Sequence, residues 1–186
     1  MEVPYVVGGL ALAVGVWVLV SYNRFVEQRN LIRDSWSNVE TELQRRYDLI
    51  PNLVETVRGY ATHEQRVLVA VTDARARAES NHGDPAAQAA DENLFVAALR
   101  QLFAVAEAYP ELRASRHFLE LQSELTDTED RIQAARRFYN ANVREWNRRI
   151  QSVPSNVVAG VFSFREEQYF QVEPTVREAG APSTSF

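Results

Sequence analysis

The chain has 186 residues, no cysteine and a formal net charge of −5, a length that suits one domain with appendages. The absence of cysteine excludes disulfides and thiolate metal sites, and the acidic balance argues against a nucleic-acid-binding protein, whose surface would be basic.

Residues 3–23 contain no charged side chain. A helix of that length rises about 30 Å, which is enough to cross the hydrocarbon core of a bilayer. A cleavable signal peptide would need basic residues before its apolar stretch and small residues at a cleavage site. Only Glu2 is charged before the stretch, and residues 18–22 offer no good cleavage site. We therefore predict an uncleaved transmembrane anchor at residues 1–23, in contact with the lipid bilayer through residues 3–23.

The flanks of this stretch predict its orientation. No arginine precedes it, whereas Arg24, Arg29 and Arg33 follow closely. Basic residues stay on the cytoplasmic side of a membrane. The sequence therefore predicts a single-pass protein of the inner or plasma membrane, with its N-terminus outside and its large domain in the cytoplasm.

An apolar repeat with alternating three- and four-residue steps runs from about residue 32 to residue 78, and we call it the apolar seam. Arg46 and Glu64 are its only charged members, and a repeat of this length predicts a helix face packed on partner helices. Pro51 lies within it, and because the repeat keeps its phase across the proline we expect a kink there and not a turn. The helix should then end near residue 80, before a loop at residues 81–85. The seam comprises Ile32, Trp36, Val39, Leu43, Arg46, Ile50, Leu53, Val57, Tyr60, Glu64, Val67, Val71, Ala74 and Ala78.

Two further helices are predicted. The first runs from about residue 86 to residue 108, with Phe95, Ala98, Leu102 and Val105 on one face. Pro110 suits the first turn of the next, which carries apolar residues at helical spacing to about residue 153. Long helices of similar length joined by a shorter one predict an all-α fold: a transmembrane helix followed by an antiparallel bundle of three long helices over residues 24–153.

The C-terminal part has a different character. Residues 154–172 begin with a short apolar element that is too short to span a membrane. We favour packing of this element on the bundle over an element lying on the membrane face. The tail at residues 173–186 is rich in proline, serine and threonine and is predicted to be disordered.

Several motifs along the chain resemble the LemA family over about residues 20–172. The most specific is the string at residues 45–54, with Arg45, Arg46, Asp48 and then Leu-Ile-Pro-Asn-Leu-Val, and residues 59–64, 119–125, 135–140 and 154–156 agree as well. The resemblance implies a bundle of up to four helices on a membrane anchor with the N-terminus outside. It implies no established biochemical activity.

No combination of residues supports a catalytic or metal site. His63-Glu64 lacks the second histidine that a zinc protease needs one turn later, since position 67 is valine. The pair Glu79 and His82 lies at a predicted helix end, and a di-iron bundle would need two such units and two further glutamates. Phosphate-binding and nucleophile motifs are also absent from the sequence. We therefore predict no enzyme, no cofactor and no metal.

Polar residues in or beside the seam form the candidate site. Such residues commonly set helix register and partner orientation, and Arg46 and Glu64 could pair with Glu129 or Arg136. On this basis Arg46→Leu should keep helicity and could raise the melting temperature, whereas Arg46→Ala should lower it. The candidate residues for register or partner contact are Arg46, Asp48, Asn52, Glu64, Arg136, Tyr139 and Asn140.

An anchor, a bundle and the lack of catalytic motifs predict a non-enzymatic scaffold or adaptor at the cytoplasmic face. It would assemble with itself or with another membrane protein. The alternative is a small-molecule or metal-binding sensor or enzyme with a polar site between the bundle helices. A third possibility is membrane shaping by residues 157–164.

Overall fold

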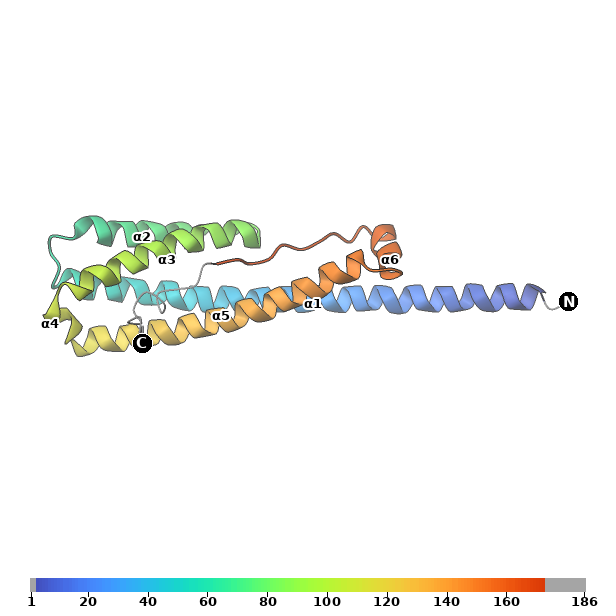
Figure 1. Ribbon diagram of the computed structural model, residues 1–186, viewed down its shortest axis with the longest axis horizontal. Coiled ribbons are helices and arrows are strands. Elements are labelled where there is room, and N and C mark those ends of the chain that lie inside the picture. The colour runs from blue at the N-terminus through green and yellow to red at the C-terminus, as the bar shows by residue number, and fades with distance from the viewer. Residues whose placement is uncertain (1–2, 173–186) are drawn as a thin grey trace, which may run out of the picture. The chain divides into compact units, whose positions relative to one another are not determined.

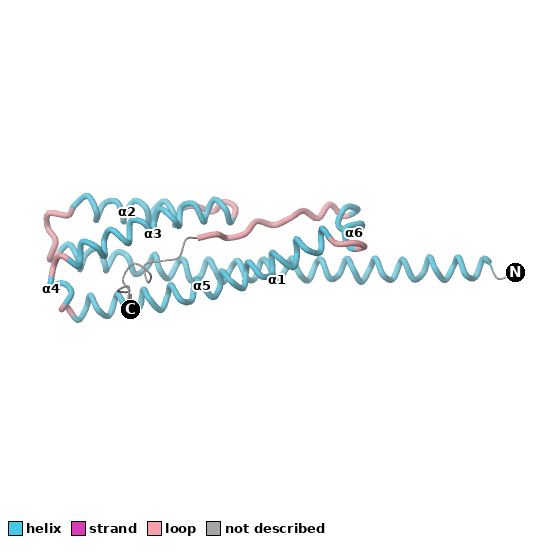
Figure 2. The backbone as a smooth tube through the Cα atoms, in the orientation of Figure 1, coloured by secondary structure: helices cyan, strands magenta, loops and turns pink. Residues whose placement is uncertain are grey.

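The computed structural model describes residues 3–172, and every regular element within them is a helix (Figure 1). The loops between the helices are short, whereas the segment after the last helix is long and extended (Figure 2). The all-α prediction is therefore confirmed. The helices are α1 (Val3–Arg58), α2 (Gln65–Ser80), α3 (Pro85–Glu107), α4 (Pro110–Arg113), α5 (Arg116–Gln151) and α6 (Ser155–Val161).

Helix α1 carries the apolar stretch of residues 3–23 at its start. It is long and apolar enough to cross a membrane, and none of its most apolar 18-residue window is buried by the rest of the protein. The helix continues past Arg24 without interruption to Arg58. A helix that is apolar all round and unburied suits a lipid environment.

The structure overturns one prediction about the seam. The helix does not run on to residue 80: α1 ends at Arg58, residues 59–64 form a turn, and α2 runs back beside α1. Pro51 stays inside α1, at an exposed position. The turn is closed by bonds to the Val57 carbonyl from the N–H groups of Tyr60 (3.0 Å) and Ala61 (2.8 Å). The repeat kept its phase because α1 and α2 each bury an apolar stripe of their own.

The other predicted helices lie close to their expected positions. Helix α3 begins with Pro85 in its first turn, and Asp84 caps it by accepting a hydrogen bond from the Ala87 N–H at 2.8 Å. The predicted third helix is divided, because the single turn of α4 precedes α5. Leu112 in α4 is fully buried, so this turn also belongs to the core.

The chain forms two compact units, each built from segments far apart in sequence. Among the described residues, unit 1 combines residues 3–37 with 138–167, and unit 2 combines residues 38–137 with 168–172. Within unit 2, α1 and α3 run in one direction and α2 and α5 in the other (Figure 1). Unit 2 is thus the expected antiparallel bundle, built from α1, α2, α3 and α5, with the single turn of α4 between α3 and α5. The boundaries predicted at residues 23 and 153 stay a prediction.

The segment after α6 lies along α5. In unit 1, the Asn147 side chain forms two hydrogen bonds with the Glu167 backbone, each 2.9 Å long. Trp146 Nε1 donates to the Arg165 carbonyl at 2.7 Å. In unit 2, Phe170 is fully buried. Side chains of α5 therefore satisfy backbone groups of a segment that has no helix or sheet of its own. The tail at residues 173–186, predicted to be disordered, lies outside the described residues.

Candidate functional site

A buried cluster of charged and polar side chains lies inside unit 2, and we call it the ion cluster. Three helices supply it: Arg46 and Tyr47 come from α1, Gln88 and Glu92 from α3, and Glu129 from α5. The side chains of Arg46 and Glu92 are 1% and 0% exposed, and that of Glu129 is 15% exposed.

The cluster is linked by hydrogen bonds throughout. Arg46 donates through Nη2 to Glu92 and through Nη1 to Glu129 Oε1 at 2.6 Å. Tyr47 donates its hydroxyl to Glu92, and Gln88 Nε2 lies 3.1 Å from the same Glu92 oxygen. Gln88 Nε2 also lies 3.0 Å from the Ala78 carbonyl of α2. Glu92 therefore has donors from two helices, and within unit 2 the cluster connects α1, α2, α3 and α5.

The Arg46 guanidinium also lies over an aromatic ring, with its carbon 5.0 Å from the centre of the Phe95 ring. Such a contact stabilises the cation further in a desolvated setting. Removing two charges from water is costly, and the cost is offset only when geometry and hydrogen bonding are good. Arg46 and Glu92 each have at least two hydrogen-bond partners, although Arg46 Nε is buried without one.

The chemistry available to the cluster is that of fixed donors and acceptors. Burial raises the pKa of Tyr47 to about 12, although the neighbouring Arg46 charge opposes this. The phenol is therefore a proton-bearing donor near neutral pH and not a base. Within residues 3–172, no group of three or more histidine, cysteine, aspartate or glutamate side chains could hold a metal ion. The geometry supports a role in setting the register of α1, α3 and α5.

Pro51 explains a contact between α1 and α2. Proline has no N–H, so the Tyr47 carbonyl four residues earlier lacks its helical donor. Arg75 of α2 fills that place, with Nε donating to the Tyr47 carbonyl at 2.7 Å. The Arg75 head also pairs with Glu79 at 3.2 Å. The proline therefore leaves the Tyr47 carbonyl of α1 free to accept a hydrogen bond from α2.

Replacing Arg75 with methionine is expected to lower the free energy of unfolding by about 1–3 kcal/mol, because the Tyr47 carbonyl would lose its donor. In a Pro51→Ala background the same replacement should cost clearly less, since the new alanine N–H can donate to that carbonyl within the helix. Urea unfolding, followed by circular dichroism, is measured for the unaltered protein, the two single variants and the double variant, and gives the difference between the two losses. Equal losses in both backgrounds would show that Arg75 stabilises unit 2 by another route.

The structure does not bring the seven predicted site residues together. Arg46 lies in the ion cluster and pairs with Glu129, one of the partners suggested from the sequence. Asp48 and Asn52 are exposed on α1, and Glu64 is half-buried at the start of α2. Arg136 donates to the Val172 carbonyl. The remaining two, Tyr139 and Asn140, belong to unit 1.

Sequence reasoning missed Tyr47, Gln88 and Glu92. The two α3 residues could have been found, because extending the stripe of Phe95 and Leu99 backward in helical steps leads to Glu92 and Gln88. Both are buried, so they occupy polar positions in an apolar stripe, as Arg46 does. Tyr47 follows Arg46 directly, and nothing in the repeat indicated its burial.

Raising the pH through about 10 to 12 is expected to destabilise the protein through two tyrosines. Burial raises the pKa of Tyr47 and of Tyr139 from 10.0 to about 12, and for Tyr139 the Glu167 charge adds to the effect. The folded state therefore holds each phenolic proton more tightly than the unfolded state. Their contribution is fully present below pH 10 and is lost as the pH rises through 12.

Urea midpoints measured across this pH range test the expectation. The double variant Tyr47→Phe with Tyr139→Phe should show a shallower loss of stability with pH. The exposed Tyr60→Phe is the matched control and should follow the unaltered protein. A double variant with an unchanged slope would exclude these two phenols as the cause.

Comparison with protein families matches residues 35–186, most of the chain, to the LemA family. The chain belongs to the LemA family. This confirms the resemblance drawn from the motif at residues 45–54, and the same motif supplies Arg46, Tyr47 and Pro51. The family match thus covers all of the ion cluster.

Individual relatives agree with this assignment. Two magnetosome proteins of Paramagnetospirillum magneticum, MamQ 1 and MamQ 2, are each 28% identical over 182 residues, covering 84% of this chain and 67% of their own length. Protein LemA of Metamycoplasma hominis is 24% identical over 169 residues, covering 89% of this chain and 77% of its own. Together with the apolar start of α1, these relatives support a membrane-associated helical protein.

Proposed function

We propose that this LemA-family chain is a non-enzymatic scaffold or adaptor anchored in the inner or plasma membrane. Residues 3–23 cross the bilayer once with the N-terminus outside, and the bundle lies in the cytoplasm. There it assembles with further copies or with other membrane proteins. One observation carries the proposal. Helix α1 is continuous from an unburied apolar stretch at its start to its end in the helical bundle.

Two further observations support the proposal. The charges of Arg46 and Glu92 are paired inside the bundle. Such pairing suits a structural role, whereas a catalytic site would keep charged groups accessible to a substrate. Arg24, Arg29 and Arg33 follow the apolar stretch, which favours the cytoplasmic side for what comes after it.

Orientation can be tested with single cysteines, because the chain contains none. A membrane-impermeant maleimide applied to intact cells should label Val3→Cys. It should label Val69→Cys, at an exposed position on α2, only after the membrane is permeabilised. The reverse pattern would place the bundle outside and overturn the orientation.

Assembly is tested by purifying the full chain from its own membrane in mild detergent and measuring the mass of the particle. We expect a reproducible assembly larger than one chain with its detergent, and mass spectrometry would identify its members. A monomer that also fails to cross-link in intact membranes would contradict the scaffold.

The alternative is a sensor or enzyme that binds a small molecule or metal between the bundle helices. One observation favours it, namely the buried Arg46 Nε without a partner, which is a donor that a small ligand could use. Native mass spectrometry of the full chain in detergent discriminates the two. Added mass that disappears in Arg46→Leu would support the alternative.

A further inference from the structure

Helix α6 has an apolar surface on two sides, and the protein covers only one of them. Val158 and Ala159 are buried at 2% exposure each. On the other side, Val157 is 61% exposed and Val161 73% exposed, and Gly160 between them is exposed as well. The flanking Val153 and Phe162 are 81% and 45% exposed. Exposed apolar side chains gathered in such a patch mark a site of contact with a protein or a membrane.

Within unit 1, α6 lies beside the end of the apolar stretch of α1. The Phe162 ring is 4.7 Å from the Tyr22 ring, and the Phe164 ring is 6.0 Å from Tyr22 and 4.9 Å from Phe25, measured between ring centres. Tyr22 is two residues before Arg24, the first charged residue after the stretch. Aromatic rings with a polar atom favour the level of the lipid headgroups. The exposed side of α6 therefore lies next to the residues expected at the membrane interface.

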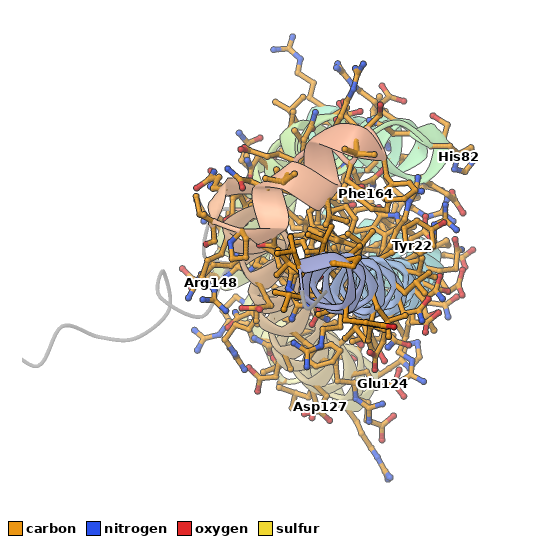
Figure 3. All side chains as sticks on the ribbon, turned by 90° about the vertical axis from the view of Figure 1, so that its right-hand side faces the viewer. Tyr22, His82, Glu124, Asp127, Arg148 and Phe164 are labelled. Atoms are coloured by element: carbon orange, nitrogen blue, oxygen red, sulfur yellow. The ribbon has the colours of Figure 1, made fainter. Side chains whose placement is uncertain are left out.

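The direction of α6 is as informative as its position. Figure 3 looks along α1 from its N-terminal side, so that α1 appears end-on while α6 lies across the view, with Tyr22 and Phe164 labelled in this region. A transmembrane helix lies within a modest tilt of the bilayer normal. A helix across its axis therefore lies along the membrane plane, as interfacial helices do.

We propose that α6 and its flanks, residues 153–162, form a second membrane contact. The exposed valines and Phe162 enter the boundary between headgroups and acyl chains in the leaflet where the α1 span ends. This inference rests on the anchoring part of the proposed function. The occupant is the bilayer because the patch continues directly from the end of the span through Tyr22 and Phe162. Val158 and Ala159 hold α6 against the protein while Val157 and Val161 contact lipid.

Three single-cysteine variants of the full chain test this proposal, since the chain has no cysteine of its own. Val161→Cys probes α6, Leu12→Cys probes the span, and Leu31→Cys is the matched aqueous control on α1. Leu31 is an exposed apolar residue in the same unit and lies about 14 Å further along the helix than Tyr22. Each protein is spin-labelled in vesicles of phosphatidylcholine and phosphatidylglycerol. Collision rates with oxygen, which enters lipid, and with a water-soluble nickel chelate are then measured.

The expected result is an oxygen-to-nickel ratio at Val161 several-fold above that at Leu31 and nearer to that at Leu12. A ratio at Val161 equal to that at Leu31, with Leu12 in lipid, would overturn the second contact and leave the anchor intact. A label at Val161 shielded from both reagents would mean that protein, including a second copy of the chain, covers α6, and this would also overturn it. An aqueous ratio at Leu12 would instead refute the anchor itself.

Discussion

Replacing Arg46 with alanine is expected to lower the free energy of unfolding by about 3–5 kcal/mol, the range for breaking a buried ion pair by removing one partner. Glu92 is fully buried. Among the ion pairs of the described residues, Arg46 is the only cation that pairs with it. Without Arg46 its charge would keep only the neutral donors Tyr47 and Gln88. Urea unfolding of the full chain in detergent, followed by circular dichroism, measures the change.

The structure reverses the expectation for Arg46→Leu. From the sequence this variant could have been more stable, because leucine would complete the apolar seam. With Glu92 buried opposite, Arg46→Leu should be destabilised about as much as Arg46→Ala. The double variant Arg46→Leu with Glu92→Leu should recover most of the loss, since apolar replacement of a whole buried pair is often neutral or stabilising. A double variant no more stable than Arg46→Leu would show that the pair does not act as a unit.

Replacing Trp146 with alanine is expected to cost about 3–5 kcal/mol, the range for removing a large buried aromatic side chain. Trp146 is 1% exposed. Its ring lies 5.4 Å from that of Phe25 and 5.5 Å from that of Phe164, both edge-on. Its Nε1 also holds the Arg165 carbonyl. The variant should therefore lose stability and release the segment after α6 together.

Limited trypsin digestion reads the release directly, because the protease cleaves after Arg165. Cleavage there should be much faster in Trp146→Ala than in the unaltered protein. Trp146→Phe is the matched control: it keeps a ring but loses the hydrogen bond, so a smaller loss of about 1 kcal/mol is expected. Unchanged cleavage in Trp146→Ala would mean that the two Asn147 hydrogen bonds hold the segment without the ring.

Local patterns in the sequence were sufficient to predict the helical class, the membrane-compatible start of α1, the extent of α3 and the family. These signals specify helices locally, wherever the rest of the chain lies. They are an uncharged stretch of sufficient length, an apolar residue at each helical step and a proline in a first turn. The family motif likewise needs only the order of residues 45–54.

The end of the seam and the contacts of its polar members depend instead on how the helices pack. The apolar repeat keeps its spacing through residues 59–64. The spacing shows which residues are apolar, but it does not show which helix they belong to. A chain reversal at Gly59 therefore leaves the repeat unchanged. Arg46 was recognisable as a buried charge, whereas its partner Glu92 is 46 positions away. The packing of α1 on α3 brings these two distant side chains together. Burial makes any unpaired charge there costly, so the folded bundle and not the local sequence determines which carboxylate meets the arginine.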